Sequence, residues 1–256
     1  MRMNSLMSAG ASFNMKANKV RLLTLVVSVL AAANGTRGGA TPSPEEGVAL
    51  AIVYDNSGSM KQPVRDSSGK YAPKYVVARR ALEAVLKRLQ AFATNPSAAA
   101  PRRIEAGLFI FSGNGARELV PFSAFEPNAI QNWTKDLPFP STGTPLGNAL
   151  TRAGQTVLNS KLARKHVLII TDGINTVGPD PAVTMPRLKQ QAAQDHANLS
   201  VHFVAFDVDA KVFDSVKKMG ATVVGASDEK QLNTQLEFIL QRKILLEDEE
   251  PPAAKK

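Results

Sequence analysis

Apolar residues recur along the chain in two patterns, which predict alternating strands and helices. Continuous apolar runs, typical of strands buried on both faces, lie at residues 48–54, 104–111, 167–170, 201–206 and, in shorter form, 222–224. Apolar residues at helical spacing lie at 74–92, 145–158, 181–197, 212–219 and 232–246, and a short helix is expected at 129–137. Strands that alternate with helices predict an α/β fold with a mostly parallel sheet and helices on both faces.

A glycine-containing turn interrupts this alternation once. Residues 112–115 read Ser-Gly-Asn-Gly, and the segment 116–122 that follows is expected to return antiparallel to the strand at 104–111. The sheet is therefore predicted to carry one antiparallel strand. Functional sites in sheets of this kind lie at the carboxyl ends of the parallel strands.

The first 33 residues are predicted to be a cleaved secretory signal peptide. Lys16, Lys19 and Arg21 precede an apolar run at 22–33, and Ala31-Ala32-Ala33 fits the small-residue rule for signal peptidase. The run is shorter than the about 20 residues that a spanning helix needs. An uncleaved membrane anchor through 22–33 and a buried helix are the alternatives, and Met15 is an alternative start.

Composition divides the rest of the chain into three parts. Residues 34–46 are rich in Gly, Pro, Thr and Ser and predict a flexible linker. Residues 47–246 carry the periodic apolar pattern and predict the folded domain. Residues 247–256, EDEEPPAAKK, predict a disordered tail.

Charge and cysteine content exclude several classes of function. The 256 residues carry a formal charge of +9, and four basic residues that precede residue 34 leave +5 for the remainder. The basic residues form no long run with interleaved aromatic side chains, so nucleic-acid binding is not expected. The chain has no cysteine, which excludes disulfides, thiolate metal sites, cysteine nucleophiles and a lipidated cysteine anchor.

Polar motifs stand at three predicted strand ends or helix starts. Asp55-Asn56-Ser57-Gly58-Ser59 follows the first strand, Ser141-Thr142-Gly143-Thr144-Pro145-Leu146 precedes a helix, and Thr171-Asp172-Gly173 follows the strand at 167–170. All three are expected to converge on one edge of the sheet. Each motif alone is typical of a turn or a helix cap, and it is their joint occurrence that favours a site.

The oxygen-bearing side chains of these motifs suit a hard cation. Mg²⁺ prefers oxygen ligands in near-octahedral geometry and retains several waters. The candidate ligands supply carboxylates and hydroxyls, with no sulfur or imidazole to favour zinc or copper; they are Asp55, Ser57, Ser59, Thr144 and Asp172. Three of these ligands are neutral hydroxyls, which leave the bound cation under-neutralised, so an acidic group of a partner is an attractive extra ligand.

These residues resemble the metal-ion-dependent adhesion site of von Willebrand factor type A (VWA) domains. The resemblance covers about residues 47–240 and fills all five motif positions. It implies a doubly wound, Rossmann-like fold with one antiparallel edge strand. It also implies that Ser57, Ser59 and Thr144 are hydroxyl ligands, direct or through water, while Asp55 and Asp172 balance charge or orient the hydroxyls.

One segment departs from the pattern of the family. Residues 61–74, KQPVRDSSGKYAPK, are longer than the usual link from the first motif to the first helix. They are predicted to form a small hairpin or lid beside the metal, which would influence which partner fits.

The resemblance implies a metal-dependent protein-binding module of adhesion type, and the predicted signal peptide implies that it is exported, either periplasmic or secreted. It would hold Mg²⁺, or Mn²⁺ or Ca²⁺, and capture an Asp or Glu of a protein partner, with no membrane insertion after signal cleavage. The alternative is a membrane-tethered or cytoplasmic VWA subunit of an ATPase-driven assembly. The oligomeric state is not specified by the sequence.

An enzyme is not expected, because no nucleophile has a base placed to activate it. His166 and His202 are predicted at strand starts, at the end of the sheet opposite the motifs, and are interpreted as structural or surface residues. Asp207 and Asp209 are interpreted as turn and cap residues rather than as part of the site rim. Trp133 and Phe139 are interpreted as core residues, with an exposed recognition surface as the alternative.

Overall fold

The computed structural model describes residues 45–95 and 103–245. The predicted signal peptide, most of the linker and the tail at 247–256 therefore lie outside the described residues. The first strand begins at Glu45, so the last two residues assigned to the linker already belong to the sheet. No helix in the described part of the chain is both long and apolar enough to cross a membrane.

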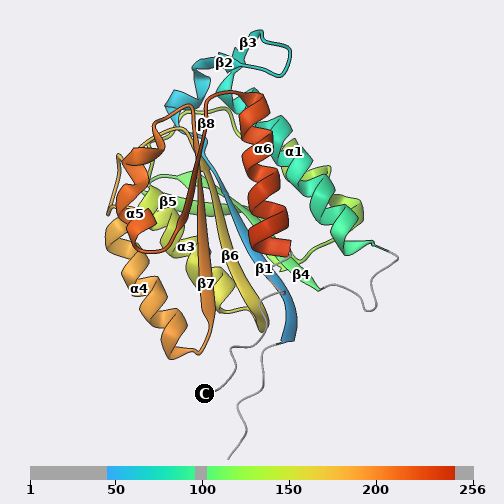
Figure 1. Ribbon diagram of the computed structural model, residues 1–256, viewed down its shortest axis with the longest axis vertical. Helices are drawn as coiled ribbons and strands as arrows, with labels where there is room; N and C mark the ends of the chain where they lie inside the picture. Colours follow the sequence, from blue (N-terminus) through green and yellow to red (C-terminus); the bar gives the residue numbers. More distant parts are fainter. Residues whose placement is uncertain (1–44, 96–102, 246–256) are drawn as a thin grey trace, which may run out of the picture. The chain divides into compact units, whose positions relative to one another are not determined.

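A six-stranded sheet forms the centre of the domain (Figure 1). Its order is β5-β4-β1-β6-β7-β8, and all neighbours are parallel except β4 and β5. The strands are β1 Glu45–Tyr54, β4 Ile104–Ser112, β5 Gly115–Ala124, β6 Leu162–Thr171, β7 Asn198–Phe206 and β8 Thr222–Ala226. The prediction of a mostly parallel sheet with one antiparallel edge strand is confirmed.

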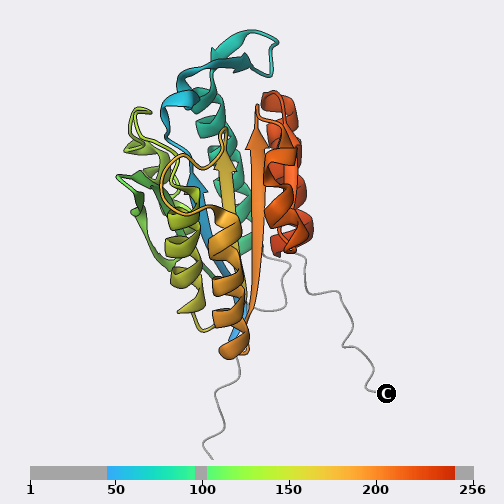
Figure 2. The same cartoon turned by 90° about the vertical axis from the view of Figure 1, so that its left-hand side faces the viewer.

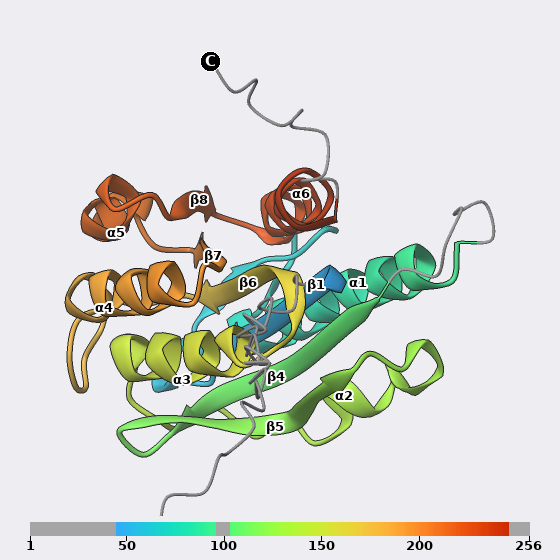
Figure 3. The same cartoon turned by 90° about the horizontal axis from the view of Figure 1, so that it is seen from below.

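Helices cover both faces of this sheet, as Figure 3 shows from below. Helices α3, α4 and α5 lie along one face, and α1 and α6 along the other. Their bounds are α1 Lys74–Ala93, α3 Leu146–Leu158, α4 Pro181–Gln194, α5 Asp214–Lys218 and α6 Glu229–Ile239. The remaining helical pieces are α2 Asn132–Lys135, the 3₁₀ turns η1 Gly58–Lys61, η2 Pro127–Ala129 and η3 Ala210–Phe213, and the π-helical turn η4 Leu240–Leu245.

Strand β1 shows why the apolar runs form buried strands. Residues 48–53 have no exposed surface. Alternate side chains pack into two separate cores: Leu50 and Ile52 face α1 and α6, while Ala51 and Val53 face α3 and α4. Complete burial of a six-residue stretch requires an apolar side chain at every position.

The long first link folds as a hairpin. Strands β2 Pro63–Arg65 and β3 Tyr71–Pro73 pair antiparallel, and the hairpin stands beyond the carboxyl end of β1 (Figure 2). The backbone N–H of Lys74 donates to the carbonyl of Gln62, which closes the base of the hairpin where α1 begins. The predicted hairpin at 61–74 is therefore present.

Several element boundaries differ from the sequence-based expectation. Strand β6 starts at Leu162 rather than at 167, because the Arg164-Lys165-His166 stretch reads as polar yet pairs with β1 and β7. Lys165 is 5% exposed and its ammonium donates to the carbonyl of Leu162, at 2.9 Å. The helix expected at 145–158 begins at Leu146, with Pro145 at the N-cap.

Candidate metal centre

The first motif loop lies at the point where the sheet reverses its winding direction. The chain continues from β1 to β4 on one side and later to β6 on the other, so the carboxyl end of β1 is a topological switch point. Tyr54 is in register with Ile110 of β4 and Ile170 of β6. Asp55 and Thr171 therefore leave the sheet side by side, as the predicted convergence requires.

Backbone hydrogen bonds join the three loops. The N–H of Gly58 donates to the carbonyl of Thr142, and Ser57 and Thr142 form a parallel bridge. The N–H of Thr176 donates to the carbonyl of Thr144, and the Thr176 hydroxyl accepts from the N–H of Thr144 at 2.9 Å. The second loop is thus fixed to the first loop on one side and to the third on the other.

The candidate ligands share one hydrogen-bonded network. The hydroxyls of Ser57 and Ser59 are 3.0 Å apart, and the Ser59 hydroxyl donates to Asp172 Oδ1 at 2.8 Å. A Cβ built on Gly173 would lie 3.7 Å from Thr144 Oγ1 and 3.8 Å from Ser59 Oγ, so both hydroxyls face this glycine. The structure therefore brings together all five residues selected from the sequence.

Asp55 is held by donors from two strands' ends. Its Oδ1 accepts from the N–H of Ser57 at 2.7 Å, and its Oδ2 accepts from the Thr171 hydroxyl at 2.6 Å. The side chain is fully buried. Burial, together with the nearby charge of Asp172, raises the pKa of Asp55 to about 6 despite these hydrogen bonds. Two buried carboxylates in one loop cluster are thus costly without a nearby positive charge.

Lys74 supplies such a charge from the first residue of α1. Its Nζ lies 3.1 Å from Asp172 Oδ2 and 2.9 Å from Asp207 Oδ2, and the residue is 2% exposed. Asp207 follows β7 directly and has a left-handed backbone with φ of 54°. Asp207 therefore lies in a turn, as interpreted from the sequence, and its contact with Lys74 also places it at the site rim. Asp209 caps η3 by accepting from the N–H of Lys211.

A comparison with family models identifies the domain. The model of the von Willebrand factor type A domain matches residues 49–238. The chain belongs to this family. The match spans all three loops of the candidate centre, and the doubly wound sheet is the fold expected of a VWA domain. No curated protein matches the chain in sequence.

Solved structures share the VWA fold at low sequence identity. A D319A mutant of the PilB minor pilin from Streptococcus sanguinis has 15% identity and a TM-score of 0.53, covering 78% of this chain and 62% of the pilin. The vWF domain of the type V pili tip protein Mfa5 from Porphyromonas gingivalis has 13% identity and a TM-score of 0.54, covering 78% and 95%.

A third similar structure is proximal thread matrix protein 1 from the mussel byssus, with a zinc-occupied MIDAS motif. It has 14% identity and a TM-score of 0.54, covering 77% of this chain and 48% of the mussel protein. The chain thus spans less than two thirds of the pilin and of the mussel protein. At these identities the likeness concerns the fold alone.

The donor set of this VWA domain fits a hard divalent cation. The five side chains offer oxygen only, and three of them are hydroxyls. Within residues 45–95 and 103–245, no group of three or more His, Cys, Asp and Glu side chains could hold a metal ion. A cation bound here would therefore depend on the hydroxyls of Ser57, Ser59 and Thr144, with Asp55 and Asp172 supplying negative charge.

Three residues that shape the VWA site, Thr171, Asn56 and Lys74, were not selected from the sequence. The Thr171 hydroxyl donates a hydrogen bond to Asp55, and the side-chain oxygen of Asn56 accepts one from the N–H of Phe111 near the end of β4, at 2.8 Å. Neither had a sequence signal beyond its place in a motif. Lys74 did have one, because a cation at the first residue of a helix opposes the helix dipole and demands nearby carboxylates.

The histidines stand apart from the site. His166 and His202 are buried in the middle of β6 and β7, rather than at the strand starts, because both strands begin earlier than predicted. Their ring nitrogens Nδ1 and Nε2 are 3.3 Å apart. The third histidine, His196, is exposed and follows α4.

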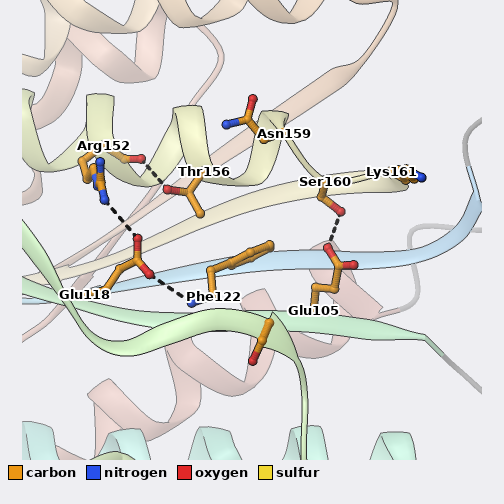
Figure 4. Close-up of a pocket in the computed structure, with 9 residues that line it drawn as sticks. Glu105, Glu118, Phe122, Arg152, Thr156, Asn159, Ser160 and Lys161 are labelled. Atoms are coloured by element: carbon orange, nitrogen blue, oxygen red, sulfur yellow. Dashed lines mark hydrogen bonds and ion pairs between the residues drawn. The ribbon is translucent and has the colours of Figure 1, made fainter.

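A separate cavity of about 570 Å³ lies between α3 and strands β4 and β5 (Figure 4). Three of its charged side chains have partners: Arg152 pairs with Glu118 at 3.3 Å, and Glu105 accepts from the Ser160 hydroxyl at 2.5 Å. The convergent polar groups of the domain are those of the three loops.

Proposed function

We propose that this chain is an exported, metal-dependent protein-binding module that captures an acidic residue of a partner protein through a bound divalent cation. Mg²⁺ is the proposed ion, with Mn²⁺ and Ca²⁺ as alternatives. The observation that carries the proposal is the hydrogen-bonded network of Ser57, Ser59 and Asp172, flanked by Thr144 and Asp55. The proposed centre is an intact metal-ion-dependent adhesion site.

The similar structures support an adhesion-type role. They include a minor pilin, a pilus tip protein and a byssus thread protein with zinc in its MIDAS motif. Zinc in that protein supports binding of a divalent cation here, while the all-oxygen donor set favours Mg²⁺ under ordinary metal supply.

Exposed apolar side chains next to the centre support a protein partner. Phe139 is 63% exposed and Ile174 is 55% exposed, and they lie on the loops that carry Thr144 and Asp172. The ammonium of Lys61 lies 5.7 Å from the centroid of the Phe139 ring. Trp133 is 5% exposed and belongs to the core, so the core interpretation holds for Trp133 and is wrong for Phe139. An apolar and basic rim would complement an acidic residue with apolar neighbours.

We propose no enzymatic activity. His166 lies six residues before Asp172 along β6, which corresponds to about 20 Å. His202 on β7 is in register with Leu168, four residues before Asp172, which corresponds to about 13 Å. The serine hydroxyls of the first loop contact each other and Asp172. Lys74 holds the other oxygen of Asp172, so we assign this carboxylate the balancing of charge at the centre rather than the role of a general base for a serine nucleophile.

Replacing Thr144 by Ala is expected to remove acidic-ligand capture while leaving the fold intact. Pro145, not Thr144, occupies the N-cap of α3, so the hydroxyl does not cap the helix and the loss of stability should stay below about 1.5 kcal/mol. The test is selection of displayed random peptides on immobilised protein in Mg²⁺, with elution by EDTA. Wild type should enrich peptides containing Asp or Glu, and Thr144→Ala should not.

Thr156→Ala is the matched control, because Thr156 lies on the same helix and its hydroxyl only bonds the carbonyl of Arg152. It should enrich the same peptides as wild type. Circular dichroism would check that Thr144→Ala is folded. If the folded variant enriches acidic peptides as wild type does, or if EDTA present during binding does not prevent enrichment, capture does not depend on this centre.

Export is a second part of the proposal with its own test. The order of basic, apolar and small residues at 16–33 predicts cleavage after Ala33. N-terminal sequencing of the native protein should begin near Asn34. An intact N-terminus would instead favour the membrane-tethered or cytoplasmic subunit of an ATPase-driven assembly.

A further inference from the structure

Lys74 is an unusual residue for its position in the fold. It is the first residue of α1, where the helix dipole disfavours a cation, and it is almost fully buried. A buried ammonium is tolerated only when its charge and its three protons are matched. Three acceptors surround Nζ: Asp172 Oδ2 at 3.1 Å, Asp207 Oδ2 at 2.9 Å and Gln62 Oε1 at 3.2 Å.

The contact with Asp172 leaves that carboxylate engaged at both oxygens. Lys74 holds Oδ2, while the Ser59 hydroxyl donates to Oδ1. Asp172 thus acts on the candidate centre through the Ser59 hydroxyl, and its negative charge is shared with a fixed ammonium. The other carboxylate of the centre, Asp55, bonds only to neutral donors from Ser57, Thr171 and Asp172 N–H.

The net charge of the site depends on this lysine. Asp55 and Asp172 alone would neutralise a divalent ion, which would leave little attraction for a further anion. Lys74 adds one positive charge in direct contact with Asp172. The charge of Asp207 offsets it only in part, because the Asp207 side chain is 40% exposed and its field is screened by water, whereas Asp172 and Lys74 are buried.

We propose that Lys74 is a positioning residue that makes a cation bound at this centre a stronger acceptor for an acidic ligand, at the expense of the affinity for the cation itself. The inference rests on the proposed function and names a residue that sets the affinities of the same centre for its cation and for its acidic ligand. The two affinities should therefore respond to Lys74 in opposite directions, which a residue that merely supports the fold would not produce.

Lys74→Met is the first test, with Mn²⁺ and acetate as probes. Isothermal calorimetry should show Mn²⁺ binding about three- to tenfold tighter than in wild type, because a positive charge has been removed. Acetate binding to the Mn²⁺-loaded protein, followed by the fall in water-proton relaxation as carboxylate replaces bound water, should be about five- to tenfold weaker. Lys70→Met removes an exposed charge from the same hairpin and should change neither value.

Asp207→Asn tests the inference by strengthening the effect of the Lys74 charge instead of removing it, and it does not disturb the core. The left-handed backbone of residue 207 suits Asn as well as Asp, and the side chain is partly exposed, so this variant is expected to fold. With its outer carboxylate removed, Lys74 is less neutralised. Mn²⁺ should bind about two- to fivefold more weakly and acetate correspondingly more tightly.

The outcomes separate this inference from the proposed function. Suppose that wild type binds both Mn²⁺ and acetate, but that Lys74→Met and Asp207→Asn leave the two affinities unchanged or change them in parallel. This result would overturn the role of Lys74 and leave the proposed function intact. If Lys74→Met does not fold, Asp207→Asn decides by itself. Absence of Mn²⁺ binding by wild type would overturn the proposed function and this inference together.

Discussion

Replacing Asp55 by Asn is expected to weaken Mg²⁺ and Mn²⁺ binding by about a hundredfold or more. The substitution keeps the size of the side chain but removes one of two buried negative charges at the centre. Two unit charges about 4 Å apart interact by about 4 kcal/mol at an effective dielectric of 20, and a hundredfold change corresponds to about 2.8 kcal/mol. Calorimetric titration with each metal measures the effect.

The same substitution should not destabilise the metal-free protein. Burial and the charge of Asp172 raise the pKa of Asp55 to about 6, so its ionised form is unfavourable in the folded state at neutral pH. Asparagine removes that cost and can still accept from the N–H of Ser57. Urea denaturation in EDTA at pH 7.5 should therefore give a free energy of unfolding at least equal to that of wild type.

Asp195→Asn is the matched control, because it removes an exposed carboxylate at the far end of α4. It should leave metal binding unchanged. Metal affinity of Asp55→Asn equal to wild type would exclude Asp55 from the centre. A metal-free variant that is markedly less stable than wild type would show that Asp55 serves the fold instead.

The convergence of the three motif loops could be predicted because it depends on strand order and direction. The apolar runs at 48–54 and 167–170 identify parallel strands, and residues that follow parallel strands meet at one edge. Asp55 and Asp172 come together for that reason. The loop before α3 joins them because helix starts lie at the same edge in a doubly wound sheet.

The role of Lys74 could not be predicted in the same way. Its partners Asp172 and Asp207 are 98 and 133 residues away in the sequence, and contact requires the hairpin, the end of β6 and the end of β7 to meet. No spacing rule relates three separate loops at the level of side-chain atoms. The anomaly of a lysine at a helix start was visible, but it indicates only that carboxylates are near, not which ones.

Residues 164–166 of β6 were not predicted as strand for a different reason. Polar residues at 164–166 broke the apolar pattern, although Lys165 bonds to backbone carbonyls and His166 is buried against His202. Polar residues that interrupt an apolar run are ordinarily interpreted as solvent-facing. Their burial can be recognised only when the partners on neighbouring elements are known. It makes the stability of this domain depend on pH, which the motifs do not indicate.

Lowering the pH from 7 to 5 is expected to reduce the free energy of unfolding by about 2 kcal/mol for each of His166 and His202. Burial lowers the pKa of His166 to about 3, with smaller contributions from His202 and Arg164, and lowers the pKa of His202 to about 4, with a contribution from Lys243. Both stay neutral in the folded state while the unfolded chain takes up protons below about pH 6.5. Stability is therefore lost as the pH falls from about 6.5 to about 4.

The hydrogen bonding of His166 and His202 also disfavours their protonation in the folded state. The two rings contact each other through His166 Nδ1 and His202 Nε2, and His202 Nδ1 has no hydrogen-bond partner among the described groups. A proton added to the buried pair would place a second donor where no acceptor lies and bury one positive charge, and a second proton would bring two positive charges together. Unfolding is the route by which these residues become charged, so acid acts on the equilibrium between folded and unfolded chain.

Urea denaturation between pH 4 and pH 7 in EDTA measures this dependence. His202→Gln keeps a polar group beside His166 but removes one titrating ring, so between pH 7 and pH 5 it should lose about 2 kcal/mol less stability than wild type. Asp55, whose raised pKa has the opposite effect on stability, is present in both proteins and cancels in the comparison. His196→Gln, at an exposed position, should follow wild type throughout. A pH dependence of His202→Gln as steep as that of wild type would mean that protonation of the buried pair does not control the acid stability of the domain.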